Sequence, residues 1–97
     1  MRFDRQEKEA LKYALQNFRG KVFLYGSRLD DSKKGGDIDI MLIPDQNANA
    51  LDLSIEIQKR FFTKCEQKLD VLVYREDNPF CQEVMKHAKR LDIQSIS

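Results

Sequence analysis

The sequence predicts an α+β domain in which a small mixed sheet of three or four strands is covered by helices. Segments with the apolar spacing of amphipathic helices alternate with short apolar runs. Those runs are rich in β-branched and aromatic residues, as strands are. The chain has 97 residues, which is too short for two typical domains. We therefore expect one domain over residues 1–97, with the element order α-β-turn-β-α-β-α.

The first part of the chain is predicted to form a helix, a strand and a turn. Asp4–Phe18 has apolar residues on one helical face, and Asp4 followed by Glu7 is typical of a capping box. Lys21–Tyr25 is short, apolar and aromatic, which indicates a buried strand. A single helical turn is expected to start at Ser27, because this residue opens a polar, turn-rich segment.

The rest of the chain is predicted to form two strands and two helices. Asp37–Ile43 is the second strand, and Lys68–Tyr74 is the third. Leu51–Cys65 begins with strand-like alternation, but its length favours a helix. Asn78 is expected to cap a last helix that has proline at its first position. The buried stripe of that helix is predicted to be Phe80, Val84, Ala88 and Leu91.

Composition argues against several classes of protein. Lysine and arginine (17) nearly balance aspartate and glutamate (16), whereas a protein that holds nucleic acid by its backbone usually has a basic excess. No apolar stretch approaches the length of a membrane span. Cys65 and Cys81 are too few for a disulfide framework, so we expect reduced thiols in a cytoplasmic protein. With one histidine, a zinc site is not expected either.

Three aspartates stand where strands usually avoid charge. Asp37 and Asp39 point to the same face of their strand, since side chains alternate across a sheet. Asp70 lies within the apolar run of the third strand. If the two strands pair, the three carboxylates converge and must take up protons or hold a cation. Oxygen ligands without histidine or cysteine favour Mg²⁺ or Mn²⁺, which also bind substrate phosphates.

A turn upstream of these carboxylates is suited to a phosphate group. Gly26 permits close approach of its backbone to a ligand, and Ser27 would open a helical turn with free N–H groups. Arg28 lies beside them in the sequence. Each feature alone has an ordinary explanation, as a plain turn, a solvated strand edge or a surface ion pair. The prediction of function depends on their occurrence together and in this order.

A resemblance to a known family rests on two segments, FLYGSRLDDSKKGGDIDIMLI and KLDVLVY. The first resembles the signature of the DNA polymerase β-type nucleotidyltransferase superfamily, Gly-Ser followed by a spacer and Asp-x-Asp. The second resembles its third-carboxylate strand. The chain is most similar to the minimal nucleotidyltransferases of bacteria and archaea, over roughly Phe3 to Leu91. It departs from the pattern in a slightly shorter spacer and in Gly36, where many members have serine.

The resemblance implies transfer of AMP from ATP to a hydroxyl group, with release of pyrophosphate and with two Mg²⁺ ions as cofactors. The implied site residues are Gly26, Ser27 and Arg28 for the nucleotide, and Asp37, Asp39 and Asp70 for catalysis and metal binding. Asp70 would hold the metal that activates the acceptor hydroxyl. Whether it also receives the proton is left open.

The family also implies a partner, because many minimal nucleotidyltransferases are antitoxins encoded beside a helical HEPN-domain toxin. We expect AMP transfer to a hydroxyl of such a protein. Two alternatives remain open at this point: an antitoxin that neutralises the toxin by contact alone, and a transferase for a small molecule such as an aminoglycoside. An exposed sheet edge also leaves pairing with a second copy possible.

Overall fold

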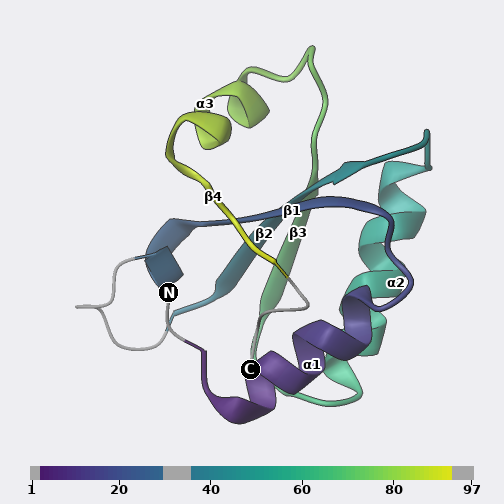
Figure 1. Cartoon of the computed structure of the whole chain (residues 1–97), viewed down its shortest axis with the longest axis vertical. Helices are drawn as coiled ribbons and strands as arrows, with labels where there is room; N and C mark the ends of the chain where they lie inside the picture. Colours follow the sequence, from purple (N-terminus) through teal and green to yellow (C-terminus); the bar gives the residue numbers. More distant parts are fainter. Residues whose placement is uncertain (1–2, 30–35, 93–97) are drawn as a thin grey trace.

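The elements follow the expected order, with one additional strand. In the computed structural model, residues 3–29 and 36–92 are described. The elements are α1 (Arg5–Leu15), β1 (Gly20–Tyr25), the 3₁₀ helix η1 (Gly26–Leu29), β2 (Ile38–Pro44), α2 (Ala50–Phe62), β3 (Leu69–Val73), α3 (Pro79–His87) and β4 (Lys89–Arg90). The predicted α+β class is thereby confirmed (Figure 1).

The four strands form one mixed sheet in the order β3-β2-β1-β4. β1 pairs antiparallel with β2 and with β4. β2 and β3 are parallel, and α2 forms the crossover connection between them, as parallel neighbours require. This topology places the start of β2 beside the start of β3, where the aspartates of both strands lie.

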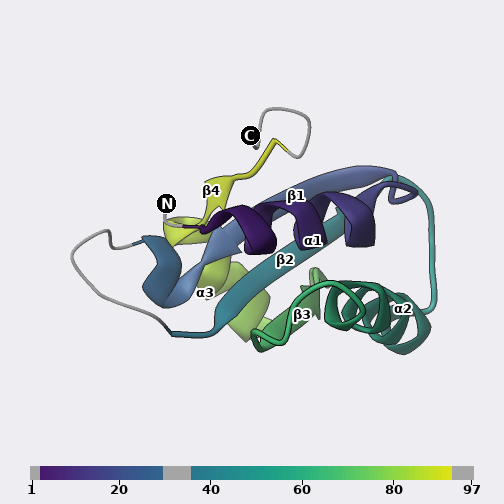
Figure 2. The same cartoon turned by 90° about the horizontal axis from the view of Figure 1, so that it is seen from below.

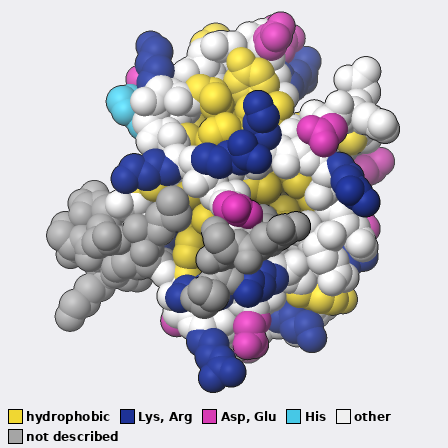
Figure 3. All heavy atoms as spheres, viewed as in Figure 1, with side chains coloured by type: hydrophobic (Ala, Val, Ile, Leu, Met, Phe, Trp, Pro, Cys, Tyr) yellow, Lys and Arg dark blue, Asp and Glu magenta, His cyan; other side chains and the backbone are white. Residues whose placement is uncertain are grey.

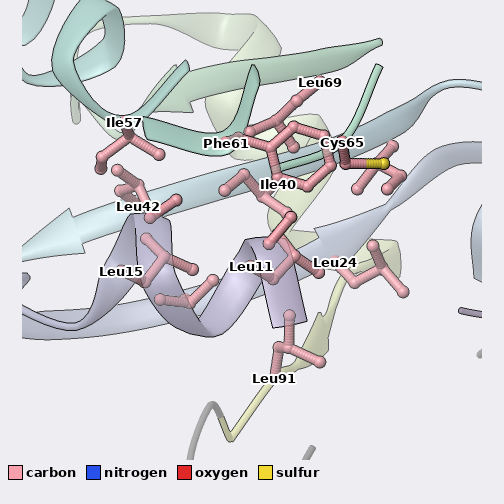
Figure 4. Packing of buried hydrophobic residues seen from close by; sticks show 14 residues of the cluster. Leu11, Leu15, Leu24, Ile40, Leu42, Ile57, Phe61, Cys65, Leu69 and Leu91 are labelled. Atoms are coloured by element: carbon pink, nitrogen blue, oxygen red, sulfur yellow. The ribbon is translucent and has the colours of Figure 1, made fainter. Parts of the chain in front are cut away.

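The main core lies between one face of the sheet and helices α1 and α2, which pack beside each other (Figures 1 and 2). Figure 4 shows leucines of α1, apolar side chains of α2 and residues of the strands packed together. Leu11 and Phe61, from the two helices, are completely buried. Both helices therefore bury an apolar face against the sheet, as the sequence predicted for the first of them, although that helix ends at Leu15 and not at Phe18.

The other face of the sheet is covered by α3 through a smaller cluster. Met41 of β2 and Cys81 and Val84 of α3 are buried there, and Phe23, Tyr25, Leu72, Tyr74 and Ala88 pack around them. These strand residues alternate with those that face the main core, as the two-residue period of a strand requires. Figure 1 shows α3 apart from α1 and α2. α3 covers one part of this face only, and the aspartates of β2 and β3 lie on the same face.

The N-terminal caps agree with the sequence patterns. The Asp4 side chain accepts a hydrogen bond from the Glu7 N–H, and the Glu7 side chain accepts one from the Asp4 N–H, which completes the capping box. Asn78 caps α3 by accepting from the Phe80 N–H, with Pro79 at the first helical position. The ambiguous segment after Asn49 is a helix, and the Asn49 side chain caps it.

The predicted end of the last helix is wrong. α3 ends at His87, because Ala88 adopts an extended conformation and the chain then pairs with β1 as the short strand β4. Leu91 consequently packs into the main core on the opposite face of the sheet. Phe80 is 55% exposed, so it does not belong to the buried stripe either. Helical spacing alone could not reveal this pairing. Leu91 lies four residues after the end of the helix, so it continues the apolar spacing of the helix although it is not part of it.

The two cysteines are free and buried, as packing thiols would be. They lie in different clusters. Cys65 belongs to the main core, and Cys81 belongs to the smaller cluster between α3 and the sheet. Among the residues that the structure describes, no helix has the length and apolar character needed to cross a membrane.

Candidate active site

A row of three polar side chains crosses adjacent strands on the α3 face of the sheet. Tyr25, the last residue of β1, pairs with Asp39 of β2, and Asp39 pairs with Asp70 of β3. The next residues of this face form the apolar row Phe23, Met41 and Leu72, which α3 covers. The polar row therefore lies beyond the apolar row, where each of its three side chains is only partly buried.

Asp39 and Asp70 interact strongly, as expected for paired positions on one face. Partial burial raises the pKa of Asp39 to about 6, and the neighbouring Asp70 carboxylate adds to the shift by repulsion and by a hydrogen bond to the protonated form. Asp37 raises this pKa further, whereas Lys68 lowers it. Holding the two carboxylates together therefore costs folding free energy through their repulsion, and a bound cation would offset this cost.

Replacing Asp39 by asparagine is expected to raise stability above pH 6 and to leave it unchanged below about pH 4. The folded-state pKa of Asp39 is about 6, above the value of about 3.9 in an unfolded chain. The folded protein therefore retains this proton longer, and wild-type stability falls as the pH rises through this window. Thermal unfolding of both proteins at pH 4 and pH 8, without metal, measures the effect. A difference in melting temperature that is the same at both pH values would contradict it.

The backbone of Gly26 lies directly against the Asp39 carboxylate. Its φ angle is +79°, which disfavours any other residue. A Cβ atom at this position would also collide with Asp39 Oδ2. The close approach in the structure is thus to Asp39, and it joins the turn to the carboxylates, while the predicted approach to a ligand stays a prediction. Ser27 follows within η1, directly after β1.

Tyr25 extends the site on the β1 side and was not predicted from sequence. Burial first, and then the charges of Asp39 and Asp70, raise the pKa of its phenol to about 12. The hydroxyl therefore keeps its proton at neutral pH. Its ring contacts Phe80 of α3 edge to face, with 6.4 Å between ring centroids. A tyrosine at the end of an apolar strand gives no sequence signal of such a position.

Asp37 does not join the other two carboxylates as expected. Its Oδ2 lies 3.6 Å from Lys68 Nζ, in an ion pair whose side chains are both well exposed. Across residues 3–29 and 36–92, no three histidine, cysteine, aspartate or glutamate side chains lie close enough together to hold a metal ion. The predicted convergence is thus present for Asp39 and Asp70, while the Asp37 carboxylate pairs with Lys68. Exposed pairs of this kind are weak, so Asp37 remains available to a cation.

Arg28 has a different environment from the one expected for a nucleotide ligand. Its guanidinium donates to both carboxylate oxygens of Glu7, at 2.8 and 2.7 Å, and the two side chains are only 6% and 5% exposed. Its Nε also donates to the carbonyl oxygen of Gly36, at 3.1 Å. Hydrogen bonding to Glu7 raises the pKa of Arg28, and burial opposes this shift. These contacts link α1, η1 and the chain just before Asp37.

The chemistry of the donors fits a magnesium ion. Asp39 and Asp70 supply paired oxygen ligands whose mutual repulsion shows in the raised pKa of Asp39, and Asp37 is nearby. Mg²⁺ typically takes one or two carboxylates and completes its shell with water and substrate phosphates. The backbone turn at Gly26 lies directly beside the Asp39 carboxylate.

Comparison with known proteins agrees with this geometry. Residues 9–95 match the family described as polymerase beta, nucleotidyltransferase. The chain belongs to this family. The resemblance noted from the sequence is therefore confirmed, and the structure has the nucleotidyltransferase fold. No curated protein matches the chain.

Solved structures share the fold at low sequence identity. One is the toxin-antitoxin MntA-HpeT in a mutant form, with a TM-score of 0.64 and 15% identity over 86% of this chain and 70% of that chain. Another is a toxin-antitoxin with AMP-PNP, with a TM-score of 0.65 and 17% identity over the same shares. A third is a tri-AMPylated Shewanella oneidensis HEPN toxin in complex with MNT antitoxin, with a TM-score of 0.56 and 18% identity over 84% of this chain and 62% of that chain.

Proposed function

We propose that this nucleotidyltransferase transfers AMP from ATP to a hydroxyl of a partner protein, a HEPN-domain toxin, and so acts as its antitoxin. The observation that carries the proposal is the pairing of Asp39 with Asp70, with the Gly26 backbone directly against Asp39. Family membership supports nucleotidyl transfer in general. The AMPylated toxin of the Shewanella oneidensis complex supports a protein acceptor.

In this proposal Asp39 and Asp70 hold Mg²⁺, and Asp37 joins them by leaving Lys68. The metal would stabilise negative charge on the phosphates and on the attacking oxygen. Gly26 and Ser27 would hold the triphosphate through backbone N–H groups at the start of η1. We assign Arg28 a supporting role, because direct phosphate binding would break a buried ion pair.

The reaction is a substitution at the α-phosphorus of ATP. The acceptor oxygen forms a bond to this phosphorus, the bond from the phosphorus to the oxygen that bridges to the β-phosphate breaks, and pyrophosphate leaves. The acceptor proton passes to a carboxylate of the site and then to water. Asp39 and Asp70 would hold the reacting groups at a fixed position. Both lie on paired strands, and the opposite face of these strands is buried in the main core.

Exposed apolar side chains beside the site suit a protein acceptor. Phe80 is 55% exposed and contacts Tyr25, and Met85 of the same helix is 36% exposed. Figure 3, in the view of Figure 1, shows hydrophobic side chains gathered where α3 lies, with lysine and arginine side chains around them. A partner bound over α3 would place an acceptor hydroxyl near Asp39 and Asp70.

The test is AMP transfer between purified proteins. The wild-type chain is incubated with ATP, Mg²⁺ and the HEPN-domain protein encoded beside it, and the intact mass of that protein is measured. The expected result is added mass in multiples of AMP, absent when EDTA replaces Mg²⁺. An unchanged mass with the wild-type chain would contradict the proposal.

A contact-only antitoxin is the second candidate. The observation that favours it is that no three histidine, cysteine, aspartate or glutamate side chains of the described residues lie close enough together to hold a metal ion. This candidate predicts that Asp37→Ala and Asp39→Ala variants still protect cells from the partner. Loss of protection in both variants, with the complex still formed, would favour the transferase.

A further inference from the structure

The backbone just before Asp37 is held by side chains from two separate parts of the fold. Arg28 Nε of η1 and Gln67 Nε2, from the segment that precedes β3, both donate to the carbonyl oxygen of Gly36, each at 3.1 Å. Gly36 has a φ angle of +91°, so this carbonyl is set by a glycine-specific conformation. Two donors thus converge on the residue that leads into the first aspartate of the site.

Arg28 is itself fixed by α1. Both oxygens of Glu7 receive hydrogen bonds from its guanidinium, and Glu7 Oε1 also accepts the N–H of Asp4 in the capping box. Two parallel hydrogen bonds between a planar guanidinium and a carboxylate restrict the orientation of both groups. Glu7 and Arg28 are also the two polar or charged side chains that are buried among the described residues. The position of the Gly36 carbonyl is therefore tied to the start of α1.

Asp37 needs such support because the sheet does not hold it directly. β2 begins only at Ile38, whose N–H donates to the carbonyl of Lys68. Asp39 and Asp70 lie within the paired strands, whereas Asp37 lies one residue outside them. Side-chain hydrogen bonds to the preceding carbonyl take the place of the strand pairing that the other two aspartates have.

We propose that Glu7, Arg28 and Gln67 are positioning residues for Asp37: they hold the Gly36–Asp37 peptide so that its carboxylate can join Asp39 and Asp70 at the metal. The metal-binding part of this inference rests on the proposed function. A purely structural ion pair would stabilise the fold without affecting metal affinity, so the two roles can be separated by experiment.

Two variants test the positioning role. Gln67→Met removes the Gln67 donor to the Gly36 carbonyl, and Glu7→Met/Arg28→Met removes both members of the buried ion pair together. Gln82→Met is the matched control, because Gln82 also donates to a backbone carbonyl, that of Glu76, in a different part of the chain. All comparisons are made at a temperature at which circular dichroism shows each variant folded.

The first readout is hydrogen exchange measured by mass spectrometry without metal. Exchange of peptides that cover residues 36–38 is expected to accelerate about tenfold in the double variant and less in Gln67→Met, while peptides of the main core stay protected. The second readout is Mn²⁺ affinity, from the electron paramagnetic resonance signal of free Mn²⁺. The dissociation constant is expected to rise about tenfold in the double variant, as for other residues that orient metal ligands.

The outcomes separate this inference from the proposed function. Exchange and Mn²⁺ affinity equal to wild type in both Gln67→Met and the double variant would overturn the positioning role. Gln67→Met alone decides the matter if the double variant does not fold. If the wild-type protein binds no Mn²⁺, the proposed function fails, and the exchange readout still decides whether these side chains hold the peptide.

Discussion

Asp70→Asn is expected to lower the rate of AMP transfer by about 100-fold or more and to leave the protein folded. Asp70 is partly exposed on β3, and asparagine has the same shape, so the pairing of β3 with β2 can persist. The substitution removes the charge of a carboxylate that the proposed function assigns to the metal, and several kcal/mol of charge stabilisation correspond to a rate change of at least about 100-fold. The rate is measured with the HEPN-domain partner, ATP and Mg²⁺ by intact mass.

The control for this prediction is Asp45→Asn, which makes the same chemical change just beyond the other end of β2. Asp45 is exposed, and its backbone N–H already bonds to Arg19. We expect wild-type rates for this variant. Retention of more than about half the wild-type rate by Asp70→Asn would remove Asp70 from the catalytic residues, because loss of a transition-state ligand cannot be that small. A contact-only antitoxin would show no transfer with any of these proteins.

The parts of the site that were predictable from sequence are those fixed by strand periodicity. Asp39 and Asp70 meet because both point to one face and because a helical crossover makes their strands parallel neighbours. Spacing and residue type predicted which way these side chains point, whereas the pairing of the two strands was a condition that the structure supplies. A tight turn at Gly26 was predictable from its place at the end of a buried strand, but its contact with Asp39 was not.

The parts that were not predictable depend on contacts between distant residues. The capping box was visible as Asp4 followed by Glu7, but nothing near Glu7 indicated that its carboxylate also binds Arg28. The Asp37 carboxylate pairs with Lys68, which lies just before β3 and 31 residues further along the sequence. The strand β4 depends on pairing with β1, which overrides the helical pattern around Leu91. Local pattern gives no information on such pairings, because they are chosen by the assembled fold.

Glu7→Ala is expected to destabilise the protein by about 3–5 kcal/mol, because it breaks a buried ion pair by removing the carboxylate that accepts two hydrogen bonds from the Arg28 guanidinium. Glu9→Ala is the matched control on the same helix. Glu9 forms only an exposed pair with Arg5, at 3.5 Å, so its loss should cost less than about 1 kcal/mol. Urea unfolding followed by circular dichroism measures both changes.

The double variant Glu7→Met/Arg28→Met decides between two physical causes of that loss. If the broken ion pair is the cause, removing both partners recovers most of the stability, since buried ion pairs contribute little net free energy compared with apolar residues of similar size. If the cause is the lost capping bond from Glu7 to the Asp4 N–H, the double variant remains as unstable as Glu7→Ala. We expect recovery, because a cap contributes only about 1 kcal/mol, whereas breaking a buried ion pair by removing one partner costs several.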